Sequence, residues 1–142
     1  MGRSVDIDVA FASPVNAAEV ISWLRDAGLS PVIDDEVSFH LTDDFDWTSQ
    51  PVANLAEVAK SIATHSAEGD TVGIAMVWPD NGFGASLLFA GDHRNVSFIL
   101  SAEKKLVEGS RTFVDFGWYL SRLVPVLEPR GLESVVCHDT HP

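Results

Sequence analysis

The sequence predicts a single α+β domain over residues 1–142, with a mostly antiparallel sheet and helices packed on one of its faces. First, residues 71–100 contain three short apolar runs with period-2 alternation, separated by polar turns. Second, helical patterns lie on both sides of this stretch, without the regular βα alternation of a doubly wound fold. Third, a chain of 142 residues, 46% hydrophobic and 21% charged, has the size and composition of one folded domain with a single core.

The chain begins with a predicted strand over residues 5–11, in which apolar side chains alternate with Asp6 and Asp8. Because aspartates on an outward face discourage pairing with other chains, we expect this to be an edge strand. A helix follows, opened by Asn16 as its N-cap and closed by Gly28.

A second strand is predicted over residues 37–42 and a second helix over residues 51–67. Carboxylates cluster at both ends of this strand, and Trp47 adjoins the second cluster. The acids are Asp34, Asp35, Glu36, Asp43, Asp44 and Asp46. Depending on whether this strand is a long arm of a hairpin, the acids form one acidic ridge or two separate tips.

The central stretch predicts strands over residues 71–78, 85–90 and 96–100. Asn81-Gly82 lies between the first two, and this pair predicts a type I′ hairpin turn because both residues tolerate positive φ. Hairpin connections make these strands antiparallel neighbours.

The last predicted helix is opened by a capping pair, Thr112 and Asp115, and Pro125 should kink or end it. Its apolar face contains Phe113, Phe116, Leu120, Leu123, Val124 and Leu127. A closing strand over residues 133–137 precedes a polar tail. The predicted order is β-α-β-α-β-β-β-α-β, with about five or six strands and about three helices.

The charge of the chain is concentrated in its first half. Residues 1–70 hold 13 acids and 3 bases (net −10), whereas residues 71–142 hold 8 acids and 6 bases (net −2). A net charge of −12 serves solubility, repels nucleic acids and anionic lipids, and attracts basic proteins. No apolar run reaches the roughly 18 residues that a membrane span needs. Cys137 is the only cysteine, so no intramolecular disulfide forms, which fits a reducing cytoplasm.

No local motif indicates catalysis, a cofactor or a nucleotide. His138 and His141 flank Asp139, but the last residues of a chain are usually frayed, so the sequence predicts no metal site and no cofactor. His40 lies near the second acidic cluster, where a neighbouring carboxylate could make it a general acid or base. We expect instead a surface histidine paired with an aspartate, and therefore predict no catalytic residue.

The first functional hypothesis is a non-catalytic, acidic protein-binding module. Its predicted contact patch comprises Asp34, Asp35, Glu36, Asp43, Asp44, Asp46 and Trp47, since an aromatic residue with a polar rim concentrates binding energy. In size, charge and α+β make-up the chain resembles the small acidic immunity proteins of bacterial toxin systems. This resemblance implies a basic toxin as the partner, and it carries over no residue roles.

The second hypothesis is a small-molecule-binding protein or enzyme, with a pocket between sheet and helices. Its candidate residues are His40, Trp78, Trp118, Tyr119 and Arg122, of which the last three should project away from the apolar stripe of their helix. A third hypothesis is a homodimer formed through an edge strand, for which residues 96–100 are the candidate. Nucleic-acid binding is not expected, because the charge has the wrong sign.

Overall fold

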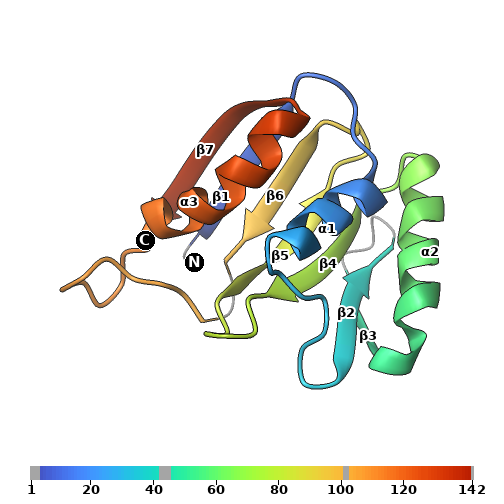
Figure 1. Ribbon diagram of the computed structural model, residues 1–142, viewed down its shortest axis with the longest axis horizontal. Helices are drawn as coiled ribbons and strands as arrows, with labels where there is room; N and C mark the ends of the chain where they lie inside the picture. Colours follow the sequence, from blue (N-terminus) through green and yellow to red (C-terminus); the bar gives the residue numbers. More distant parts are fainter. Residues whose placement is uncertain (1–3, 42–45, 101–102, 142) are drawn as a thin grey trace.

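The computed structural model describes residues 4–41, 46–100 and 103–141. Within these ranges the chain forms one α+β domain with seven strands and three α-helices, in the order β-α-β-β-α-β-β-β-α-β (Figure 1). The strands are β1 (Ser4–Phe11), β2 (Glu36–His40), β3 (Thr48–Pro51), β4 (Val72–Val77), β5 (Gly84–Phe89), β6 (Asn95–Ile99) and β7 (Leu132–Thr140). The helices are α1 (Ala17–Asp26), α2 (Leu55–Ala67) and α3 (Phe116–Leu127), with single 3-10 turns η1 (Val52–Asn54) and η2 (Glu128–Arg130).

The seven strands form one sheet in the order β3-β2-β4-β5-β6-β1-β7, and every neighbouring pair is antiparallel. The helices lie on one face of this sheet (Figure 1), as the sequence predicts. None of the helices in the described ranges is long and apolar enough to cross a membrane.

A row of side chains that pair across five strands forms the centre of the core. Ile7, Phe98, Leu87, Ile74 and Phe39 are successive cross-strand partners from β1 to β2. All five are buried on the helix-covered face. Because burying one such side chain contributes about 1.5–3 kcal/mol, this row fixes the register of the sheet.

The opposite face has no helix and carries mainly small or polar side chains, and we call it the open face. Asp6, Gly73, Ser86 and Ser97 belong to it, since each alternates with a buried neighbour along its strand. An antiparallel sheet can leave one face to solvent in this way.

Two expectations about edge strands are wrong. β1 pairs with both β6 and β7, so Asp6 and Asp8 lie on an interior strand and do not protect an edge. β6 pairs with both β5 and β1, so the strand predicted at residues 96–100 has no free edge for pairing between copies. The edges of the sheet are β3 and β7.

One strand and one turn type differ from what the sequence predicts. β3 has the sequence Thr-Ser-Gln-Pro, which lacks apolar alternation, and its proline is tolerated because β3 is an edge strand. Between β4 and β5, Gly82 has φ 77° but Asn81 has no positive φ, so the turn is not type I′. Instead the amides of Asn81 and Gly82 both donate to the carbonyl of Trp78.

The C-terminal third also differs from its prediction. α3 begins at Phe116 with Asp115 as its N-cap, whose carboxylate accepts from the Trp118 amide. Phe113 therefore precedes the helix and is 52% exposed, whereas Tyr119 is only 1% exposed instead of projecting away. β7 continues through Thr140, so the segment expected to be a frayed tail is mostly strand.

Candidate functional site

The β2–β3 hairpin forms one edge of the sheet and carries the acids that the sequence predicts as a contact patch. Asp34, Asp35 and Glu36 are exposed at the start of β2, and exposed Asp46 and Trp47 lie just before β3. Asp43 and Asp44, the other two predicted contact residues, lie outside the described residues.

A tight two-residue turn presents the first acidic group. Ile33 and Glu36 exchange both backbone hydrogen bonds, at 2.9 and 3.0 Å, and the residues between them, Asp34 and Asp35, have φ values of 53° and 62°. Positive φ at both central positions is the requirement of a type I′ turn, which normally takes Asn-Gly or Asp-Gly. Two adjacent aspartates in this conformation store backbone strain.

Trp47 follows Asp46, the described acid of the second group, and its side chain packs on the open face. Its ring lies beside His40 of β2, with ring centroids 5.8 Å apart, and reaches Gly73 of β4. His40 is 1% exposed, and its Nδ1 lies 3.4 Å from the carbonyl oxygen of Asp46. The expectation of a surface histidine is therefore wrong, because the indole covers the imidazole.

The two acidic groups lie at opposite ends of β2, so the structure favours two tips over one continuous ridge. β2 spans four residue steps from Glu36 to His40, or about 13 Å at 3.3 Å per residue. Each tip carries an exposed apolar side chain close to a described carboxylate. Trp47 follows Asp46 in the chain, the Val52 amide donates to the carbonyl of Asp35, and Trp47 and Val52 are both 40% exposed. One protein surface of ordinary size can cover both tips.

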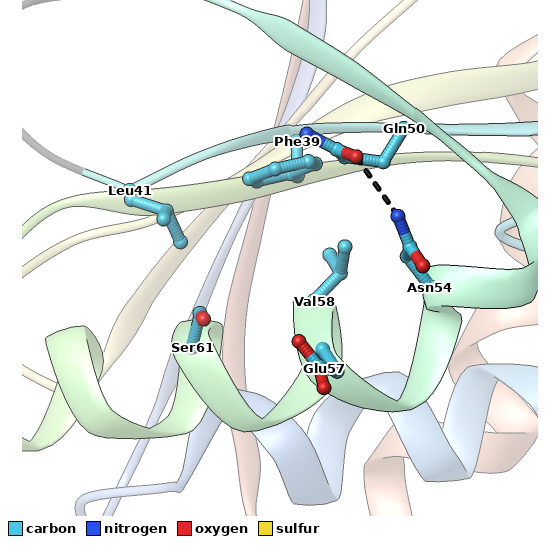
Figure 2. Close-up of a pocket in the computed structure, with 7 residues that line it drawn as sticks. All are labelled: Phe39, Leu41, Gln50, Asn54, Glu57, Val58 and Ser61. Atoms are coloured by element: carbon cyan, nitrogen blue, oxygen red, sulfur yellow. Dashed lines mark hydrogen bonds between the residues drawn. The ribbon is translucent and has the colours of Figure 1, made fainter.

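A hollow of about 290 Å³ lies between this hairpin and α2 (Figure 2). Phe39 and Leu41 line it from the strand side, and Val58 and Ser61 line it from α2, with Glu57 also in the lining. At one end the Asn54 amide donates to Gln50 Oε1 at 3.0 Å. The hollow is thus a depression of mixed apolar and polar lining with one carboxylate. No local pattern in the sequence predicts it, because its walls come from separate elements.

The residues proposed for a small-molecule pocket are divided by the sheet. Trp78, Trp118 and Tyr119 pack together, with the Trp118 ring edge-on to Trp78 at 5.3 Å. Arg122 joins them, with its Cζ 3.6 Å from the centre of the Trp118 ring. His40 lies on the open face, whereas Tyr119 belongs to α3 and is buried on the helix-covered side of the sheet. Three aromatic rings and the Arg122 guanidinium therefore pack together, and His40 does not join them.

The C-terminal histidines are also separated. His138 lies on the open face opposite Asp6, with Nδ1 2.8 Å from Asp6 Oδ1. Asp139 points the other way, where Oδ2 accepts from the Val114 amide and Oδ1 lies 3.1 Å from His141 Nε2. Alternation along the chain therefore places His138 on the opposite face from Asp139 and His141, so these three side chains do not share one ion.

The single thiol shows no sign of activation. Cys137 lies half-buried on β7, and burial raises its pKa, with the carboxylates of Asp6 and Asp8 raising it further. A thiol whose pKa is raised is a poor nucleophile at neutral pH.

Comparison of the chain with protein-family models, with curated proteins and with solved structures found no match.

Proposed function

We propose that the protein is a non-catalytic, acidic protein-binding module whose β2–β3 edge binds a basic protein. The proposal rests on one observation: among the described residues, each tip of this edge combines at least one exposed carboxylate with an exposed apolar side chain. Apolar contacts supply binding energy when surrounding polar groups exclude water, and carboxylates of one sign steer a basic partner toward them.

Two further features support this edge as the contact surface. β3 has a neighbouring strand on one side only, so an extended segment of a partner can pair with its outer side. The hollow beside it suits a lysine or arginine, whose aliphatic stem packs on Phe39 and Val58 while Glu57 supplies a carboxylate for the cationic head.

The kind of partner follows from charge and from the resemblance to immunity proteins. A net charge of −12 fits a protein that neutralises a basic bacterial toxin by covering its surface. Within this proposal the protein acts in the cytoplasm, in keeping with its single cysteine.

The test uses the protein encoded by the neighbouring gene, and measures its association with this chain at several salt concentrations. The variant D35K/D46K reverses one carboxylate at each tip. We expect it to associate at least about tenfold more slowly than the wild type at low salt, with a flatter salt dependence. The same variant should protect cells less well against that neighbouring protein.

The matched control is E128K/E133K, which makes the same change in net charge at exposed positions in η2 and β7, by the opposite edge. It should retain most of the wild-type association rate. Equal effects of the two variants would show that net charge alone drives binding and would refute the β2–β3 edge. No binding of any basic neighbour would refute the function itself.

A further inference from the structure

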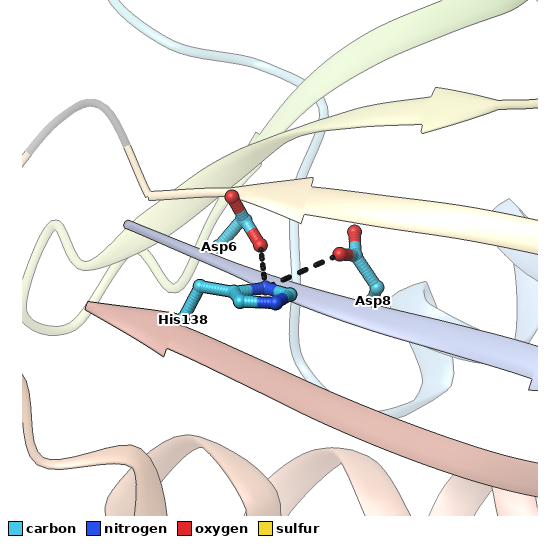
Figure 3. A group of neighbouring side chains, drawn as sticks. All are labelled: Asp6, Asp8 and His138. Atoms are coloured by element: carbon cyan, nitrogen blue, oxygen red, sulfur yellow. Dashed lines mark hydrogen bonds and ion pairs between the residues drawn. The ribbon is translucent and has the colours of Figure 1, made fainter. Parts of the chain in front are cut away.

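A group of three side chains on the open face lies far from the β2–β3 edge. Asp6 and Asp8 are two residues apart on β1, so their side chains share a face, and His138 of β7 is the cross-strand partner of Asp6 (Figure 3). Two hydrogen-bonded strands therefore bring the two carboxylates together with an imidazole that lies 132 residues after Asp6 in the sequence.

The donor atoms of this group are spaced as ligands of one ion would be. His138 Nδ1 lies 2.8 Å from Asp6 Oδ1 and 3.5 Å from Asp8 Oδ2, and all three atoms lie within 4.8 Å of one another. Zinc bonds nitrogen and oxygen at about 2.0–2.2 Å, which places its ligand atoms roughly 3–3.5 Å apart. An ion can therefore be bound with side-chain adjustments alone.

The second oxygen of each carboxylate is held by a serine. Ser4 Oγ donates to Asp6 Oδ2 at 3.0 Å, and Ser97 Oγ donates to Asp8 Oδ1 at 2.7 Å. Such outer contacts orient metal ligands and leave the inner oxygens directed at the ion. Side-chain exposures of 21% for Asp6, 43% for Asp8 and 47% for His138 leave room for water at the remaining positions.

We propose that Asp6, Asp8 and His138 form a binding site for a divalent transition-metal ion such as Zn²⁺. An imidazole nitrogen with two carboxylate oxygens suits zinc and its first-row neighbours, whereas Ca²⁺ and Mg²⁺ prefer oxygen ligands throughout. The imidazole distinguishes this group from an ordinary acidic cluster. The bound ion links β7, the edge strand, to β1.

A second group in the described ranges, His65, Glu68 and Asp70, serves as an internal comparison. His65 Nδ1 lies 3.0 Å from Asp70 Oδ2, and Glu68 is the residue just after α2. Its three residues come from the end of one helix and the turn that follows. The long Glu68 side chain must therefore complete the site, whereas two paired strands hold Asp6, Asp8 and His138.

The experiment is calorimetric titration of the full chain with Zn²⁺, with circular dichroism to confirm that each variant is folded. We expect one equivalent to bind to the wild type, and each of D6N, D8N and H138A to lower the affinity at least about tenfold. H65A and H141A, which remove histidines elsewhere, should leave the affinity unchanged.

A second readout does not depend on any variant. Paramagnetic Co²⁺ added to the isotope-labelled wild type should shift the amide resonances of Asp6, Asp8 and His138 first. Shifts centred instead on Glu68 and Asp70, the absence of one-equivalent Zn²⁺ binding, or unchanged affinity in H138A would each overturn the proposal. Because the site lies away from the β2–β3 edge, its failure would leave the partner-binding proposal standing.

Discussion

The indole of Trp47 lies directly against Gly73, at a point where the sheet has no side chain. A Cβ added to Gly73 would lie 3.0 Å from Trp47 Cη2, 2.7 Å from the carbonyl oxygen of Leu87 and 2.9 Å from Leu88 Cδ2. The glycine therefore allows the indole to reach across the open face of β4 from the second acidic tip. Trp47 is fixed by the sheet even though it is 40% exposed.

Replacing Gly73 with alanine should displace Trp47 and destabilise the fold by about 1–3 kcal/mol, because a methyl group would overpack this site. Urea unfolding measures the loss, and an altered Trp47 indole resonance in NMR spectra reports the displacement. The matched control is G117A in the first turn of α3, where an added Cβ has ordinary contacts. There the better helix propensity of alanine should stabilise by up to about 1 kcal/mol. Equal stability of G73A and the wild type would contradict the packing described here.

Replacing Asp35 with glycine should stabilise the protein by about 0.5–1 kcal/mol, because Asp35 has φ 62° and Asp-Gly is a preferred type I′ pair. The midpoint of urea unfolding measures the gain. D80G is the control, since Asp80 is an exposed turn aspartate whose own φ is not positive, and this substitution should bring no gain in stability. The absence of any gain in D35G would show that Asp35 adopts this turn conformation without measurable strain.

Replacing Tyr119 with phenylalanine should cost about 1–3 kcal/mol, because the Tyr119 hydroxyl oxygen accepts the Lys105 amide at 2.9 Å. Burial raises the pKa of Tyr119 above its ordinary value of 10.0. The stability that depends on the neutral phenol is complete below that value and is lost as the pH rises through the raised pKa. Tyr119 is the only tyrosine, so absorbance titration reports its ionisation directly. A midpoint at or below 10 would be incompatible with its buried position.

The ionised carboxylate of Asp92 stabilises the fold, so we expect the protein to become less stable in acid as Asp92 is protonated. Its Oδ1 accepts the amides of Arg94 and Asn95, at 2.9 and 3.0 Å, and these hydrogen bonds lower the pKa of the carboxyl below 3.8. The stability from the ionised form is present above 3.8 and is lost as the pH falls through the lowered pKa. In D92N this contribution is absent, so the stability gap between wild type and variant should narrow below about pH 4. Thermal unfolding of the wild type and of D92N across this pH range measures the difference in stability. A difference that does not depend on pH would show that ionisation of Asp92 does not stabilise the fold.

Local patterns predicted most of the fold. Six of the strands and all three helices follow from period-2 or helical spacing, and Asn16 caps α1 through its side chain as its residue type indicates. The sequence pattern does not predict β3, because an edge strand needs no apolar alternation. The start of α3 was misplaced because Thr112 and Asp115 both suit an N-cap, and only packing decides between them.

The fold class, the acidic composition and the clustering of carboxylates at both ends of β2 can be read directly from the residues of the chain. Contacts in the folded chain were needed to show that the described carboxylates lie at two tips with Trp47 and Val52, that β1 is interior, and that His138 meets Asp6 and Asp8. The reason is physical. Alternation reports which face of a strand is buried, but the order of strands in a sheet depends on long-range contacts, which leave no periodic signal in the chain.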